Sequence, residues 1–173
     1  MSLLRPIGTT ATLLGVLLLA TGVHATDVSM ANGSVTFTAP DAWPTIMQTQ
    51  GDPEARVFQV PDPSPTGKRS LARITVTVKV APTVNAFEQY MSDATAKAMS
   101  LPGYKAVPGV PRPNGMVYTA QESGVAADYS EQYWMKNGYA IQLRCVRPAQ
   151  SEAGAAWKAA FDKGCAAIAA QLK

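Results

Sequence analysis

Apolar and polar residues alternate most regularly between positions 71 and 80. Because successive side chains of a strand point to opposite sides, this alternation predicts a strand with one buried and one solvated face. Shorter stretches that also suit strands lie at residues 34–38, 45–50, 56–60 and 116–122. In the strand predicted at residues 71–80, the buried face would carry Ala72, Ile74, Val76, Val78 and Val80. The solvated face would carry Arg73, Thr75, Thr77 and Lys79.

Two segments show the spacing of three and four residues that is typical of amphipathic helices. The first begins after Pro82, runs to about Ser100 and is stopped by Pro102 and Gly103. The second follows Ser151, which suits an N-cap because its hydroxyl can accept a hydrogen bond from a free backbone N–H. The apolar stripes are Phe87, Tyr90, Met91, Ala94 and Ala98 in the first helix and Trp157, Phe161, Cys165, Ile168 and Leu172 in the second.

Asn137 and Gly138 predict a tight hairpin turn, since this pair suits a two-residue loop. Pairing would run outward from Lys136 opposite Tyr139. We expect an exposed Glu131–Arg144 pair, which would contribute only about 0.2–1 kcal/mol but supports the register. One face then pairs Trp134 with Ile141, Gln132 with Leu143 and Ser130 with Cys145, and the other pairs Met135 with Ala140, Tyr133 with Gln142, Glu131 with Arg144 and Tyr129 with Val146.

The order of these elements is strands, helix, strands, helix, with hairpins in place of strand–helix–strand units. That order predicts an α+β fold in which two helices pack on an antiparallel sheet. The chain of 173 residues shows no internal repeat and no linker. We therefore expect residues 26–173 to form a single domain.

The N-terminal segment has the three-part form of a secretory signal peptide. Arg5 is the only charged residue among the first 26, and an apolar run covers residues 13–20. Val23 and Ala25 then offer small side chains at the −3 and −1 positions. We expect cleavage between Ala25 and Thr26, which makes residues 1–25 the signal peptide.

An uncleaved membrane anchor is the alternative, but it needs about 20 consecutive apolar residues. The threonines and glycines on both sides of the run leave too few. No cysteine follows the run to carry a lipid, and no second long apolar segment exists. We therefore expect a soluble protein without a transmembrane segment, in the periplasm or secreted.

The two cysteines fall on predicted buried faces that meet. Cys145 shares its hairpin face with Trp134, and Cys165 lies on the apolar stripe of the last helix, next to Gly164. In an oxidising compartment this arrangement predicts a Cys145–Cys165 disulfide. It would close a loop of about 20 residues and contribute near 3 kcal/mol. A redox-active pair and two free thiols are the alternatives, and the absence of a Cys-x-x-Cys spacing argues against the first.

Composition argues against most catalytic chemistry. His24 is the only histidine and would leave with the signal peptide, so histidine-dependent triads and histidine-rich zinc sites are excluded from the mature chain. Carboxylates such as Asp52 and Glu54 are close in sequence, but their spacing alone does not place them across a cleft. A net charge of +3, spread along the chain, does not indicate nucleic-acid binding. We expect neither an enzyme, a cofactor nor a metal site.

The chain resembles the PsbP-like and DcrB-like superfamily of α/β/α sandwich proteins. The strand of Val35 and Phe37 runs into Pro40 and Trp43, like that family's opening strand followed by a proline and a tryptophan. Ala42 stands where the family often has a glycine. The helix after Pro82, the closing hairpin and the final helix follow the family's order of elements. The resemblance implies a three-layer sandwich and an accessory or adaptor role without catalysis.

Three regions are candidate binding surfaces, each with a structural alternative. Trp43 is either a core residue or a platform for a ligand. Arg112, in the proline-rich segment 107–115, belongs either to a rigid connector or to a stiff binding loop. The hairpin face away from the cysteines is either a second core layer under the first helix or a recognition face rich in residues typical of interfaces; it carries Tyr129, Glu131, Tyr133 and Arg144.

Two functions suit these features. The first is a binding or accessory protein of the periplasm that acts by contact with a ligand or with another envelope protein. The second is an immunity or inhibitor protein that blocks a toxin or hydrolase acting on the envelope. The sequence does not decide the oligomeric state.

Overall fold

The structure, a computed structural model, describes residues 24–68, 71–109 and 113–173. The strands after position 45 form one sheet of seven in which all neighbouring strands are antiparallel. In spatial order they are β3 (Thr45–Thr49), β4 (Glu54–Gln59), β5 (Arg73–Val80), β9 (Tyr139–Pro148), β8 (Val125–Lys136), β7 (Gly115–Glu122) and β6 (Lys105–Ala106).

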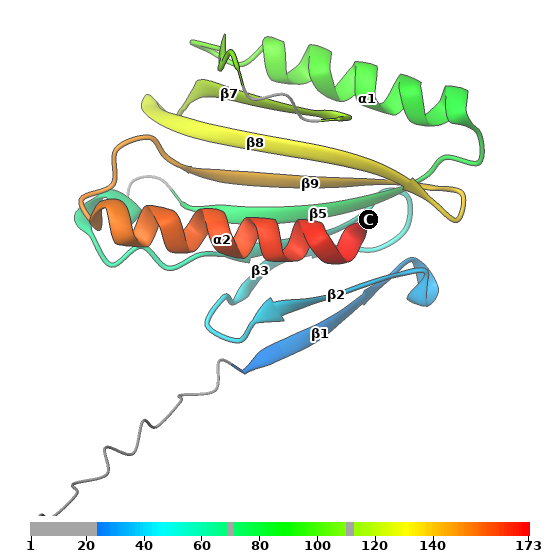
Figure 1. The fold of residues 1–173 in the computed structure, drawn as a ribbon, viewed down its shortest axis with the longest axis horizontal. Helices are drawn as coiled ribbons and strands as arrows, with labels where there is room; N and C mark the ends of the chain where they lie inside the picture. Colours follow the sequence, from blue (N-terminus) through cyan, green and yellow to red (C-terminus); the bar gives the residue numbers. More distant parts are fainter. Residues whose placement is uncertain (1–23, 69–70, 110–112) are drawn as a thin grey trace, which may run out of the picture.

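Two helices and a separate two-stranded hairpin cover this sheet, with one helix on each face (Figure 1). The hairpin packs beside the second helix on the same face. The predicted α+β class is thereby confirmed. The remaining elements are β1 (Ala25–Met30), β2 (Val35–Pro40), α1 (Val84–Met99), α2 (Gly154–Leu172) and the 3-10 turns η1 (Ala31–Gly33) and η2 (Pro65–Lys68).

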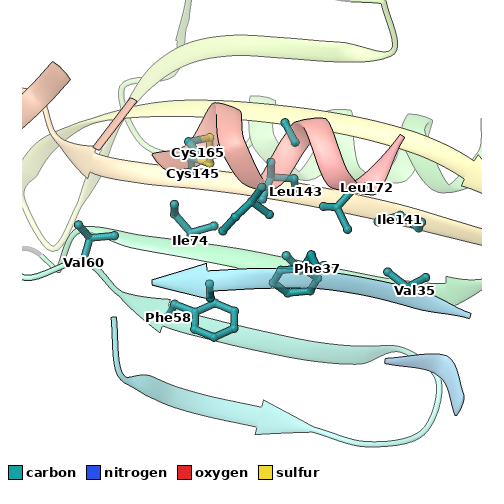
Figure 2. Close-up of a cluster of buried hydrophobic side chains, with 14 of the residues drawn as sticks. Val35, Phe37, Phe58, Val60, Ile74, Ile141, Leu143, Cys145, Cys165 and Leu172 are labelled. Carbon is teal, nitrogen blue, oxygen red and sulfur yellow. A yellow bond between two sulfur atoms is a disulfide. The ribbon is translucent and has the colours of Figure 1, made fainter. Parts of the chain in front are cut away.

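The larger core lies between the sheet on one side and α2 and β2 on the other. Ile141 and Leu143 of β9, Leu172 of α2 and Phe37 of β2 all belong to this core (Figure 2). Phe37 also meets Phe58 of β4 edge to face, with ring centroids 6.0 Å apart. The apolar stripe of α2 and the inward side chains of β2 therefore pack on one face of the sheet, as period-two and helical spacing predict.

A second core lies under α1, on the opposite face. Phe87 of α1 packs with Tyr133 and Ala140, while Ala98 packs with Tyr118 and Tyr129. Of the two alternatives for this hairpin face, the second core layer is the one that the structure shows.

The predicted hairpin register is confirmed pair by pair, from Lys136 opposite Tyr139 to Tyr129 opposite Val146. The predicted strands are also present, with ends shifted by one or two residues. Helix α1 begins where expected, because the hydroxyl of Thr83 accepts a hydrogen bond from the backbone N–H of Ala86.

The predicted start of the last helix is wrong by two to three residues. Helix α2 begins at Gly154, and its N-cap residue, Ala153, provides no side-chain cap. The hydroxyl of Ser151 instead accepts a hydrogen bond from the N–H of Ala153 and donates one to Asp62. Ser151 thus ties the segment before α2 to the loop after β4, and a turn separates it from the helix.

Val80 is a second correction, since it is 51% exposed and not on a buried face. It is the last residue of β5 and lies opposite Tyr139 at the hairpin turn. The sheet ends at this point. The alternation of apolar and polar residues therefore extends to Val80, but no packed element of the described chain covers the side chain there.

The disulfide between Cys145 of β9 and Cys165 of α2 is present (Figure 2). Gly164, next to Cys165 on α2, makes room for Trp43. A Cβ atom at position 164 would clash with the tip of the indole ring. Trp43 is half-buried and packs against the larger core, which favours the core alternative for this residue.

Most of the predicted signal peptide lies outside the described residues, because the description begins at residue 24. Ala25, at the predicted cleavage position, pairs with Pro40 as the first residue of β1, and Thr26 pairs with Ala39. Export and cleavage stay predictions. Among the helices that the structure describes, none is long and apolar enough to cross a membrane.

Candidate binding groove

Each helix covers only part of the seven-stranded sheet. Helix α1 packs over β7, β8 and β9 on one face. On the other face α2 and the β1–β2 hairpin cover β4, β5 and β9 (Figure 1). Among the residues that the structure describes, no helix lies over the α2-side face of β7 and β8.

A groove of about 660 Å³ follows this uncovered face, between β8 and the side of α2. Such a volume lies within the usual range for small-molecule sites. Asp128, Ser130 and Gln132 occupy alternate positions of β8 in the lining, because strand side chains alternate between faces. Tyr129 of β8, Tyr118 of β7 and Phe161 of α2 line the groove as well. The lining includes Ser130 and Gln132 of β8, Val117 of β7, Val107 after β6, and Ala166, Ala169 and Ala170 of α2.

A charged cluster occupies one end of the groove. The guanidinium of Arg147, which is 9% exposed, donates to Asp162 of α2 at 3.0 Å and to Asp128 of β8. Lys158 approaches Asp128 to 3.8 Å. Two cations and two carboxylates thus balance each other, and the cluster ties α2 to the strands beside it.

The other end of the groove lies at the C-terminus of α2. Lys173 is the last lining residue, and its backbone oxygen accepts a hydrogen bond of 3.1 Å from the ammonium group of Lys136. Among the described residues, the ammonium group of Lys173 itself has no carboxylate within salt-bridge distance.

Glu131 was expected to be exposed, but it is completely buried on the opposite, α1-side face. One carboxylate oxygen accepts hydrogen bonds from the Tyr118 hydroxyl at 2.6 Å and from Arg144 at 2.8 Å. The other accepts from the Tyr133 hydroxyl and, at 2.6 Å, from the Gln142 amide. All four hydrogen bonds to this carboxylate come from side chains of the protein. They supply the hydrogen-bond donors that a buried charged carboxylate requires.

The proposed recognition face made of Tyr129, Glu131, Tyr133 and Arg144 is therefore not on the surface. The two tyrosines are 4% and 2% exposed, and α1 packs over the face that they share. Arg144 keeps 26% of its side chain exposed but is committed to Glu131. Arg112 lies outside the described residues, so the prediction for it stays open.

The polar cluster under α1 changes the acidity of its phenols. Burial raises the pKa of Tyr90 to about 12. Burial and the hydrogen bond to Glu131 raise the pKa of Tyr118, and burial and the charge of Glu131 raise that of Tyr133. Both phenols stay protonated in the folded protein at pH values where an unfolded tyrosine, with a pKa near 10, ionises.

Alkaline pH should therefore destabilise the fold. Above about pH 10 the unfolded chain binds fewer protons than the folded chain, so the free energy of unfolding falls by up to about 1.4 kcal/mol per pH unit for each such tyrosine. Urea unfolding between pH 8 and 11 measures this slope. The Tyr133→Phe variant should show a shallower slope than the wild type, and equal slopes would contradict the assignment.

The groove was not predicted from the sequence, because the buried faces were assigned from the apolar residues of each element alone. Ser130 and Gln132 were placed on the correct face, but that face was expected to lie in the core with Cys145. The sequence did contain a sign of this groove. The polar residues Asp128, Ser130 and Gln132 occupy every second position of the strand and so share the face that was expected to be buried. In the described residues no group of three or more His, Cys, Asp or Glu side chains is placed to hold a metal ion.

Comparison with known proteins supports the fold. LpqN from Mycobacterium tuberculosis, described as involved in cell envelope biogenesis, has a similar structure with a TM-score of 0.50 and 12% sequence identity; the match covers 86% of this chain and 88% of LpqN. The chain has an α+β sandwich fold. PA94 from Pseudomonas aeruginosa, a protein of unknown function described as a candidate regulator, matches with a TM-score of 0.44 and 16% identity over 73% of this chain and 84% of its own.

At 12% identity the similarity to LpqN shows the fold alone. No protein-family model matches the chain, and no curated protein matches it. The specific resemblance to the PsbP-like and DcrB-like superfamily therefore stays a prediction.

Proposed function

We propose that the protein is an exported, non-catalytic accessory protein of the cell envelope, and that it acts by binding a ligand or a partner segment in the groove between β8 and α2. The observation that carries this proposal is the groove itself. It is a concave, partly apolar surface that a single-domain protein of this size leaves open between two well-packed cores.

The compartment is supported by separate observations. A disulfide holds the domain together, as is usual outside the reducing cytosol. The N-terminal sequence has the pattern of a signal peptide. LpqN, which shares the fold, is described as involved in cell envelope biogenesis, and a similar setting suits this chain.

Binding suits the groove better than chemistry does. The charged groups at one end of the groove, Arg147, Asp128 and Asp162, are engaged with one another. An activated nucleophile or general base needs a partner that leaves it free to react with substrate. The mature chain would also lack histidine, the commonest acid–base catalyst.

Site-specific photo-crosslinking in native cells tests the proposal. A photoreactive phenylalanine analogue placed at Ala170, on the groove wall, should form a discrete cross-linked product. The same group at Ala167 is the matched control, because Ala167 is also an exposed alanine of α2 but does not line the groove. Mass spectrometry of the product identifies a macromolecular partner.

Equal cross-linking at both positions, or none at position 170 in an exported and folded variant, would count against a groove-binding function. A single captured toxin or envelope hydrolase whose activity the protein blocks would decide for the inhibitor form of the proposal. Any other stoichiometric partner would decide for the accessory form.

A further inference from the structure

The predicted cleavage site lies in the first strand of the described domain, at the open end of the β1–β2 hairpin. Ala25 and Thr26 are the first two residues of β1 and pair with Pro40 and Ala39 of β2. Strand β1 is the outer strand of this hairpin (Figure 1), and four of its six residues are exposed. Backbone hydrogen bonds to β2 therefore hold the start of β1, and burial adds little.

The side chain of Thr26 is bonded to a carboxylate that has no cation beside it. The Thr26 hydroxyl donates a hydrogen bond of 2.6 Å to Oδ1 of Asp41, just beyond β2. No lysine, arginine or histidine of the described residues lies within salt-bridge distance of Asp41. The backbone N–H of Asp41 donates to the carbonyl oxygen of His24 at 3.2 Å. Asp41 thus closes the open end of the hairpin with an unbalanced negative charge.

The backbone pattern brings the nitrogen of Thr26 close to the same carboxylate. In an antiparallel pair every second residue exchanges hydrogen bonds with the residue opposite, and the bond between Asp41 and His24 shows which residues do. This pattern assigns the N–H of Thr26 to the carbonyl oxygen of Ala39. A threonine nitrogen lies roughly 3 to 3.7 Å from its own Oγ1, so this nitrogen is at most about 6 Å from Oδ1 of Asp41.

Cleavage would convert this nitrogen into a cation. Hydrolysis of the Ala25–Thr26 bond consumes one water molecule: Ala25 leaves as a carboxylate, and the amine of Thr26 takes up the proton and becomes an ammonium group. One of its three hydrogens still serves Ala39, and two are free for Asp41. The imidazole of His24 leaves with the signal peptide. The carboxylate of Asp27 lies on the opposite face of β1, across from Thr38.

The hairpin that this contact would close also holds the last turn of α2. The backbone N–H and the hydroxyl of Thr38 donate to Oε1 of Gln171 at 2.8 and 3.1 Å. Gln171 directly follows Ala169 and Ala170, which line the groove. The β1–β2 hairpin is therefore joined to the helix that forms the groove wall.

We infer that signal-peptide cleavage does more than release the protein: the new α-ammonium group of Thr26 binds the carboxylate of Asp41 and anchors the start of β1. Opposite charges at a separation of about 4–6 Å attract each other enough to matter. The hairpin therefore reaches its full local stability only after processing. This inference rests on the export that is part of the proposed function, and it adds a consequence of maturation.

Protein purified after export of the full chain tests the inference, and N-terminal sequencing should show Thr26 first. Acetic anhydride at pH 6.5 acetylates the α-amine in preference to lysine, because their pKa values are about 8 and about 10.4. Acetylation removes the charge but keeps an N–H for Ala39. Hydrogen exchange at the amide of Ala39, which the backbone pattern pairs with the carbonyl of Thr26, should become about two- to fivefold faster, as expected for an exposed ion pair.

The Asp41→Asn variant isolates the charge, because its side-chain oxygen can still accept the hydrogen bond from Thr26. In this variant acetylation should have almost no effect on exchange at Ala39. Asp27→Asn is the matched control, since Asp27 is also an exposed aspartate next to the new N-terminus but lies on the other face of β1. Its response to acetylation should equal that of the wild type.

An equal acetylation effect in the wild type and in Asp41→Asn would overturn the inference. So would exported protein that begins at any residue other than Thr26, because the ammonium group would then be absent from this position. Groove-specific cross-linking at position 170 does not need the contact between Thr26 and Asp41. It would in either case still support the proposed function, so the two failures are distinguishable.

Discussion

Replacing Glu131 with alanine should destabilise the fold by about 3–5 kcal/mol, which is typical when one partner of a buried ion pair is removed. The side chain is fully buried and accepts four hydrogen bonds. Without it, the guanidinium of Arg144 and the hydroxyls of Tyr118 and Tyr133 lose their acceptor under α1. Urea unfolding at neutral pH, followed by tryptophan fluorescence, measures the loss.

A second substitution separates charge from packing. The Glu131→Gln variant keeps the shape of the side chain but places an NH₂ group against donors, since two donors face each carboxylate oxygen. It should be nearly as destabilised as the alanine variant. Replacing both Glu131 and Arg144 with leucine and methionine should recover part of the loss, because no unpaired charge is left.

Glu88, an exposed glutamate of α1, is the matched control. Its Glu88→Gln variant should change the free energy of unfolding by no more than about 0.5 kcal/mol. A loss below about 1 kcal/mol for Glu131→Ala would show that the carboxylate is solvated, and the buried network would then be wrong.

Glu131 also shows what the periodicity of the sequence can and cannot predict. The Asn137–Gly138 turn fixes the register, so the sequence places Glu131 opposite Arg144 correctly. Periodicity tells which side chains share a face but not what covers that face. Here α1 covers one side of β8 and β9, so a pair that reads as exposed becomes buried. The cost of removing one partner therefore rises from a fraction of a kcal/mol to several, because the other partner is left without its counter-charge away from water.

The groove could not be predicted from the sequence for a related reason. The apolar stripe of α2 predicts correctly that this helix packs on the face of Cys145. It does not predict that the helix lies over β9 and β5 and leaves β8 partly open. That offset is fixed by particular side-chain contacts, such as Arg147 with Asp162, and by Trp43 filling the space beside Gly164. Such tertiary contacts have no period in the sequence.

Removing the disulfide should be the second large effect on stability. Cys145 and Cys165 are 20 residues apart, and closing a loop of that length contributes about 3 kcal/mol by restricting the unfolded chain. The variant in which both cysteines become alanine should therefore unfold at a clearly lower urea concentration than the oxidised wild type. The wild-type protein under reducing conditions, which keeps both sulfur atoms in the core, separates the cross-link from the packing.

The same double substitution also tests which contacts keep α2 in place as the wall of the groove. Cys145 and Arg147 are neighbours on the α2-side face of β9, and they bind Cys165 and Asp162, which lie one turn apart on α2. Because the ionic contact remains when the cross-link is lost, the alanine variant should keep α2 in place and still cross-link through position 170. Adding Arg147→Met should abolish that cross-linking at a urea concentration where the domain is otherwise folded by circular dichroism. Cross-linking that persists without both contacts would show that the apolar stripe of α2 alone positions the groove wall.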